Sequence, residues 1–310
     1  MSLAPTRIVN EAPIRGRARE SRSLLSGIAS DAVGPRSECS PRPKGKRLGV
    51  EDVRVSSWAE LQEQLFADAW HPELHRFRSD FAYRGRNDVA EDLRTSLLRL
   101  GGEPASVELH LLRNFRKYAQ REDVPVDSVW NWLALAQHHG LPTRLLDWTY
   151  SPYVAAHFAT SRLELFDRDG VVWMVDYVSA QEAAPAQLRD VLHAQGMNVF
   201  TAELLEDAAG GLRELAGLAE ADYVLFLEPP SLNERIVNQY ALFALMSRPE
   251  ARLDEWLEPR PELARRLVIP AELKWEVRDK LDQANITERV LFPGLDGLTR
   301  WLARYYAPRP

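Results

Sequence analysis

The segment from Trp130 to Ala159 constrains the fold of this chain more than any other stretch, because polar side chains are crowded between its apolar blocks. Apolar residues recur at helical spacing after Asp127, which can cap a helix. Residues 144–148 are apolar enough for a buried strand, and Ser151 followed by Pro152 is typical of the start of a second helix. We therefore predict a helix, a turn, a strand and a helix in succession.

Charged and hydrogen-bonding side chains occur within this segment at positions where burial is expected. A buried arginine or aspartate is costly in free energy unless it is ion-paired or bound to a ligand. Polar groups packed this densely beside a turn therefore predict a functional site. The polar residues are Gln137, His138, His139, Thr143, Arg144, Asp147 and Thr149.

The remainder of the chain predicts an α+β fold. Ser57 can cap a helix, and Glu60 completes the Ser-x-x-Glu capping pattern, so we expect the folded domain to begin near residue 55. Strands and helices follow one another in irregular order, which favours an α+β fold over a doubly wound parallel sheet. Strands are predicted at 81–83, 170–175, 223–227 and 267–269, single helices at 92–100, 106–120, 271–283 and 294–305, and two helices within 180–217.

A second polar group of residues surrounds Arg84, which follows an aromatic strand and precedes Gly85. An arginine at a strand end followed by glycine presents a permanently charged, five-donor fork beside a backbone that a ligand can approach closely. That geometry suits a phosphate or a carboxylate. An ion pair between Arg84 and a nearby aspartate is an equally compatible alternative.

The net charge of the 310-residue chain is −6, but it is unevenly distributed. Residues 1–50 contain ten Arg or Lys against four Asp or Glu, a net charge of +6, which leaves −12 for the rest. A basic leader rich in Ser, Pro and Gly is typical either of a disordered extension without a role or of an arm that contacts nucleic acid. We expect residues 1–50 to be a disordered leader.

Composition and motifs exclude several classes of protein. Cys39 is the only cysteine, which excludes a disulfide framework and fits a reducing cytoplasm. No apolar run approaches the ~18 residues of a membrane span, so we expect a cytoplasmic protein without membrane contact. The glycine-rich nucleotide-binding motifs, the nucleophile elbow and His-Glu-x-x-His are absent. Adjacent His138 and His139 would point about 100° apart on a helix, so no metal site is expected.

Three segments of the chain resemble the FRG domain family, which is named for a Phe/Tyr-Arg-Gly signature and occurs in bacteria and their phages. The segments are Tyr83-Arg84-Gly85, residues 136–149 and residues 291–298. The resemblance extends in order along the chain, which implies one FRG-like domain over residues 55–306.

A further resemblance is to the ADP-ribosyltransferase fold, a mixed, mostly antiparallel sheet flanked by helices. It implies that an early arginine contacts NAD as the substrate, that a Ser/Thr-containing strand precedes a small-residue helix, and that a later glutamate completes the site. Breaking the bond between nicotinamide and ribose develops positive charge on the sugar, which a carboxylate stabilises. The expected catalytic residues are Arg84, Asp147, Thr149 and Glu234. The expected nucleotide-binding residues are Tyr83, Arg84, Gly85, Gln137, His138, Arg144, Ser151, Arg235 and Gln239.

These resemblances imply a cytoplasmic bacterial ADP-ribosyltransferase that uses NAD to modify a protein or a nucleic acid, as a toxin or a phage-defence effector. Two alternatives stay open. The same pocket would serve a non-catalytic module that binds a nucleotide or, with help from the leader, a nucleic acid. Alternatively, the polar groups only fix the fold of an interaction scaffold, with Arg144 and Asp147 as a buried ion pair that orients the turn.

Overall fold

The computed structural model describes residues 49–120, 124, 126–231 and 234–308. The described residues belong to one compact unit. Residues 1–48 lie outside them, so the expected disorder of the basic leader and its contact with nucleic acid stay predictions.

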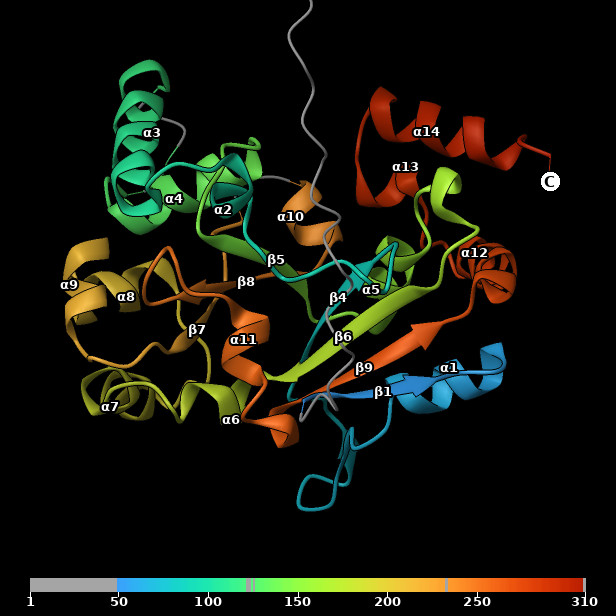
Figure 1. Ribbon diagram of the computed structural model, residues 1–310, viewed down its shortest axis with the longest axis horizontal. Helices are drawn as coiled ribbons and strands as arrows, with labels where there is room; N and C mark the ends of the chain where they lie inside the picture. Colours follow the sequence, from blue (N-terminus) through green and yellow to red (C-terminus); the bar gives the residue numbers. More distant parts are fainter. Residues whose placement is uncertain (1–48, 121–123, 125, 232–233, 309–310) are drawn as a thin grey trace, which may run out of the picture. The chain divides into compact units, whose positions relative to one another are not determined.

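A seven-stranded sheet forms the centre of this unit (Figure 1). Its strands are β1 (Glu51–Arg54), β4 (Phe81–Arg86), β5 (Leu145–Thr149), β6 (Gly170–Asp176), β7 (Val224–Leu227), β8 (Ala241–Met246) and β9 (Ala264–Ile269). They lie in the order β1, β9, β6, β4, β5, β8, β7, and every neighbouring pair is antiparallel except β1 and β9. The predicted α+β fold with a mostly antiparallel sheet is therefore confirmed, whereas its likeness to the ADP-ribosyltransferase fold stays a prediction.

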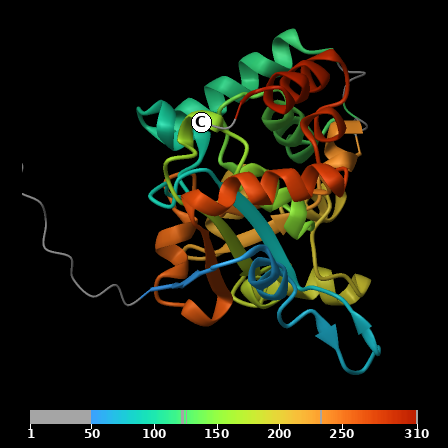
Figure 2. The ribbon, with the colours of Figure 1, turned by 90° about the vertical axis from the view of Figure 1, so that its right-hand side faces the viewer.

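Four strands, β1, β2, β3 and β8, were not predicted from the sequence. β2 (Trp70–His71) and β3 (Arg76–Phe77) form a separate hairpin that projects away from the main sheet (Figure 2). β1 has mostly exposed residues and no apolar alternation, so its sequence carries no strand pattern. It is a strand because it pairs in parallel with β9 at the edge of the sheet.

Helices cover both faces of the sheet. On one face, α1 (Trp58–Leu65), α5 (Pro152–Ala159) and α12 (Lys274–Gln283) share an apolar cluster with β4, β6 and β9. On the same face, the helices within residues 104–138 and 186–217 share a second cluster with β5, β7 and β8. A third cluster fills the opposite face. The remaining helices are α2 (Ser96–Leu100), α3 (Pro104–Tyr118), α4 (Val129–His138), α6 (Tyr177–Gln181), α7 (Ala186–Gln195), α8 (Ala202–Ala208), α9 (Leu212–Gly217), α10 (Glu234–Asn238), α11 (Leu253–Leu257), α13 (Glu288–Leu291) and α14 (Leu295–Tyr305).

The central segment has the predicted order of helix, strand and helix, which are α4, β5 and α5. Ser151 caps α5 and Pro152 is its first residue, as predicted. α4 is capped by Ser128, and the predicted cap, Asp127, instead accepts a hydrogen bond from Trp132 Nε1 at 2.8 Å. The capping prediction for α4 was therefore wrong by one residue.

Two helix predictions were too long. The helix predicted at 92–100 begins only at Ser96, because the Thr95 side chain caps it there. The two helices predicted within 180–217 are instead three short ones, α7 to α9, which follow the end of α6. Gly196 ends α7 in the left-handed conformation, with φ of 63°.

α5 lies very close to β4 at Gly85. A Cβ atom at this position would lie 1.9 Å from the carbonyl oxygen of Ala155 and 2.5 Å from the backbone nitrogen of Ala159. Only glycine therefore allows the helix to pack at this depth. The sequence suggested that Gly85 lets a ligand approach the backbone, which stays a prediction; in the structure Gly85 admits the backbone of a helix.

β4 and β5 share a single register pair, Tyr83 with Thr149, in the described part of the chain. Beyond that pair β4 continues to Arg86 alongside β6. The strands β4 and β5 therefore separate, and an opening forms between them.

Candidate functional site

A cavity of about 340 Å³ lies where β4 and β5 separate. Its volume is within the range of small-molecule sites, about 300–1,000 Å³. Its walls come from these two strands, the end of α4, the loop after α5, and α10 with the start of β8. The sequence-predicted residues that line it are Tyr83, Arg84, Gly85, Gln137, His138, Asp147, Thr149, Arg235 and Gln239.

Arg84 bridges the opening between the two strands. Its Nη1 donates a hydrogen bond to the carbonyl oxygen of Asp147. Its Nε is buried and has no hydrogen-bond partner among the described residues. Burial lowers the pKa of Arg84 to about 10, against the opposing charge of Asp147, so the guanidinium stays charged at neutral pH. A buried donor without an acceptor costs free energy, and an anionic ligand would supply that acceptor.

Asp147 presents an exposed carboxylate to the same cavity. Its Oδ1 accepts a hydrogen bond from Gln137 Nε2 at 2.9 Å. The other end of that amide, Gln137 Oε1, accepts a hydrogen bond from Thr143 Oγ1 at 2.6 Å. The chain from Thr143 through Gln137 therefore orients the carboxylate beside the charged Arg84.

The cavity wall carries more arginines than carboxylates. Arg86 forms an ion pair with Glu91, while Arg235 is exposed. Burial lowers the pKa of His138, and the charge of Arg235 acts in the same direction, so this imidazole is mostly neutral at pH 7. The excess positive charge favours an anionic ligand. The arginines are Arg84, Arg86, Arg162 and Arg235, and the carboxylates are Glu91 and Asp147.

Arg144 was expected to hold a phosphate or to pair with Asp147, and neither expectation is met. Its side chain is 4% exposed, and its Nε donates to Glu108 Oε1 at 2.8 Å. Its Nη1 donates to the carbonyl oxygen of Ser247 at 2.9 Å. Arg144 therefore forms a buried ion pair, as one alternative proposed, but its partner is Glu108 and not Asp147. Glu108 is distant in the sequence and lies outside the cavity.

The hydroxyl groups of two expected site residues, Thr149 and Ser151, form hydrogen bonds within the protein. Thr149 Oγ1 donates to the carbonyl oxygen of Gln239 at 2.7 Å and accepts from the backbone nitrogen of Ser151 at 3.0 Å. Ser151 Oγ accepts the first backbone N–H bond of α5, at 3.3 Å from Val154. These hydroxyls thus fix the junction of β5, α5 and β8, and Ser151 does not line the cavity.

Tyr83 and Glu234 also lie differently from what was expected. Tyr83 is 1% exposed, and its hydroxyl donates to the carbonyl oxygen of Leu65 at 3.2 Å, so the ring belongs to the core. Glu234, at the start of α10, lines an adjoining cavity that it shares with Phe292 and Arg300. In the cavity at the strand opening, Asp147 and Glu91 are therefore the available carboxylates.

Several lining residues were missed by the sequence reasoning. Arg86 could have been found, because it is two residues after Arg84 on a strand and therefore lies on the same face. Glu91 and Arg162 lie in loops, where no periodic pattern marks them. The apolar lining comes from Phe158, Phe243, Ile236, Trp148 and Ala241.

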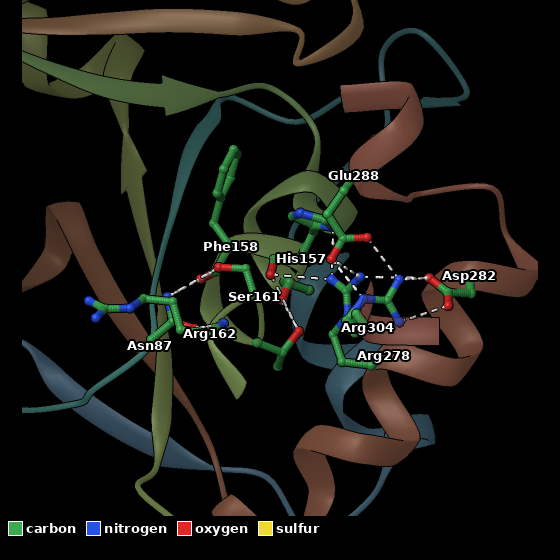
Figure 3. A network of polar contacts seen from close by, with 11 residues as sticks. Asn87, His157, Phe158, Ser161, Arg162, Arg278, Asp282, Glu288 and Arg304 are labelled. Atoms are coloured by element: carbon green, nitrogen blue, oxygen red, sulfur yellow. Dashed lines mark hydrogen bonds and ion pairs between the residues drawn. The ribbon is translucent and has the colours of Figure 1, made fainter. Parts of the chain in front are cut away.

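A buried charge cluster joins α5 to the C-terminal helices (Figure 3). Glu288 Oε2 accepts a hydrogen bond from Arg304 Nη2 at 2.8 Å, and Glu288 Oε1 accepts one from Arg278 Nη2 at 3.2 Å. Arg304 also donates to both carboxylate oxygens of Asp282, at 2.9 and 2.6 Å. Arg278 Nη1 donates to His157 Nδ1 at 2.7 Å. The cluster therefore ties α12, α13 and α14 to the helix behind the cavity.

The two arginines of this cluster set the protonation of its neighbours. Burial raises the pKa of Glu288, but hydrogen bonds from Arg304 and the charge of Arg278 outweigh it and hold the pKa at about 2. Burial lowers the pKa of His157 to about 3, and Arg278 acts in the same direction. At neutral pH the carboxylate is therefore ionised and the imidazole is neutral.

The fold and the cavity define an α+β domain with an arginine-lined cavity that also presents a carboxylate. This chain carries an FRG domain, because the model of that family matches residues 79–168. The match contains the Tyr-Arg-Gly strand and the whole central segment, whereas Arg235 and Gln239 of the cavity lie beyond it. No curated protein and no solved structure shows significant similarity to the chain.

Two structural features bear on the remaining expectations. No helix within the described ranges is long and apolar enough to cross a bilayer. In the part of the chain that the structure covers, no three His, Cys, Asp or Glu side chains are placed to hold a metal ion.

Proposed function

We propose that the cavity binds a phosphate-bearing nucleotide, with NAD as the candidate substrate, and that the domain transfers ADP-ribose to a macromolecule. The observation that carries the proposal is Arg84, whose charged side chain faces the cavity with its Nε lacking an acceptor among the described residues. Guanidinium groups bind phosphate oxygens through short, charge-assisted hydrogen bonds. A nucleotide phosphate is the ligand that best satisfies this group.

Asp147 supports a catalytic role for the cavity. In ADP-ribosyl transfer the bond between ribose C1′ and the nicotinamide nitrogen breaks, and its electron pair leaves with neutral nicotinamide. A nucleophile of the acceptor bonds to C1′ and releases its proton to solvent. The positive charge that develops on the ribose is stabilised by the Asp147 carboxylate, which Gln137 holds in place at 2.9 Å. Such an activity would suit a toxin or a phage-defence effector.

The binding part of this proposal is tested by calorimetry with NAD on the full chain. Arg84→Gln removes the charge and should weaken NAD binding by roughly 10- to 100-fold, since hydrogen bonds to charged groups contribute about 1.5–3 kcal/mol. The matched control is Arg213→Gln, because Arg213 is exposed on α9 and does not line the cavity. Absence of NAD binding by the unaltered protein would overturn the proposal.

The catalytic part is tested by measuring nicotinamide release with cell lysate as the source of acceptor. Asp147→Asn should lower the rate by about 100-fold or more, as for other electrostatic stabilisers of a transition state, with little change in NAD affinity. Equal rates for the two proteins would exclude Asp147 as the stabilising carboxylate.

A non-catalytic module that binds a nucleotide is the second candidate. It is favoured by the engagement of the Thr149 hydroxyl within the protein and by the position of Glu234 outside the cavity. NAD binding without nicotinamide release would support it. If the leader binds nucleic acid, deletion of residues 1–50 should abolish the affinity of the protein for nucleic acid and the salt dependence of that affinity.

A further inference from the structure

A second cavity, of about 710 Å³, adjoins the first one and shares His138 and Arg235 with it. It lies between α10, the turn that follows α13, and α14. We call this cavity the annex, and its polar and aromatic lining consists of His138, Glu234, Arg235, Phe292, Asp296 and Arg300. Because two residues line both cavities, one extended ligand can occupy them together.

Two guanidinium groups in the annex lie against one aromatic ring. The Cζ atoms of Arg235 and Arg300 are 5.1 and 5.4 Å from the ring centre of Phe292. Neither arginine forms an ion pair with a carboxylate of the described chain, so their N–H donors are available to a ligand. Stacking on a ring also orients a guanidinium and reduces the entropy that it loses on binding.

Carboxylates and planar groups are both present in the annex. Glu234 and Asp296 supply acceptors of the kind that bind ribose hydroxyl groups. Phe292 and its stacked guanidinium groups supply flat surfaces of the kind on which a base stacks. Phosphate donors, ribose acceptors and stacking surfaces together are the groups that a nucleoside phosphate requires.

The walls of the annex are held in place by hydrogen bonds between α10 and α13. Asn238 Nδ2 donates to the carbonyl oxygen of Val290 at 2.8 Å, and Gln239 Nε2 donates to that of Leu291 at 2.9 Å. α13 itself contains Glu288, the centre of the buried charge cluster. These hydrogen bonds hold α10, which carries Arg235, against α13, which ends next to Phe292.

We propose that the annex is the subsite for the second nucleoside of a dinucleotide whose pyrophosphate lies between Arg84 of the first cavity and Arg235, which lines both cavities. The inference rests on the proposed function, in which the cavity beside Asp147 takes the nicotinamide riboside. The annex then takes the adenosine half. A first cavity of about 340 Å³ is at the low end for a ligand site, so a dinucleotide requires the adjoining volume.

The test compares calorimetric affinities of the full chain for NAD and for nicotinamide mononucleotide. NAD should bind at least about tenfold more tightly, because only NAD reaches the annex. Arg300 lines the annex but not the first cavity, so Arg300→Gln should weaken NAD binding by about fivefold or more and leave mononucleotide binding unchanged. The control is Arg289→Gln, whose guanidinium lies 4.5 Å from the Trp301 ring and lines neither cavity; it should behave as the unaltered protein does.

Two results would overturn the inference, and they are distinguishable. Equal affinities for the two ligands, with no effect of Arg300→Gln, would exclude the annex as a nucleoside subsite but leave the proposed function of the first cavity intact. Binding of neither ligand would overturn both the proposed function and the proposed subsite.

Discussion

The three residues of the Tyr-Arg-Gly signature have three different roles on one strand. Tyr83 packs in the core and Gly85 admits α5, whereas Arg84 bridges the opening at the cavity. Because alternate residues of a strand face opposite sides, the first and third residues can serve packing while the second serves the site. The signature therefore combines a charged group with the two contacts that fix its strand.

Gly85→Ala should destabilise the protein by about 1–3 kcal/mol or more, because the new methyl group would overlap the backbone of α5. Urea denaturation of the two proteins measures the loss. Gly217→Ala is the matched control, since a Cβ atom there meets nothing within 4 Å, and its stability should be unchanged or slightly higher. Equal stabilities of Gly85→Ala and the unaltered protein would contradict the packing role.

At the scale of elements, the C-terminal helices are part of the site although they lie outside the matched FRG region. α13 accepts two hydrogen bonds from the α10 region, and α10 carries Arg235 to the cavity. Arg278 and Arg304 hold Glu288 of α13. Arg278 also donates to His157 of α5, so the buried cluster holds α13 against α5. The position of Arg235 thus depends on ion pairs that lie far from it in the sequence.

The same cluster predicts a pH dependence of stability. The pKa of His157 falls from the ordinary 6.5 to about 3 in the folded protein. Below pH 6.5 the unfolded chain therefore binds a proton that the folded protein excludes, and this proton favours the unfolded state. The free energy of unfolding accordingly falls as the pH falls from 6.5 toward 3. The neighbouring charged groups on the packed elements are Arg278, Arg304 and Glu288, which stay ionised over most of this range.

His157→Asn keeps an acceptor for Arg278 and removes the titrating group. Between pH 6.5 and 5, the free energy of unfolding of the unaltered protein should fall more steeply than that of the variant, by up to about 1.4 kcal/mol per pH unit. Urea denaturation at several pH values measures both slopes. Parallel slopes would show that His157 is not excluded from protonation in the folded state.

At the scale of the whole molecule, local signals were predictable and long-range pairings were not. The Ser57 and Ser151 caps follow from short sequence patterns and are confirmed. The partner of Arg144 is Glu108, 36 residues away, and no spacing rule identifies it. β1 has no apolar pattern and depends on pairing with β9, which is more than 200 residues further along the chain.

The residues of the candidate site were also predictable only from local patterns, without their long-range partners. Polar density in the central segment indicated Gln137 and Asp147, and both line the cavity. The pattern could not separate them from Arg144 and Thr149, whose polar atoms are satisfied inside the protein. That distinction depends on where β4 and β5 separate, which only the three-dimensional pairing determines.

The most direct test of the central claim is a crystal structure of the full chain with ADP-ribose. We expect a phosphate oxygen within hydrogen-bond distance of Arg84 Nε, the donor that has no partner in the described chain, and the ribose that would bear nicotinamide near Asp147. A ligand bound elsewhere, or one that leaves Arg84 without contact, would contradict the account.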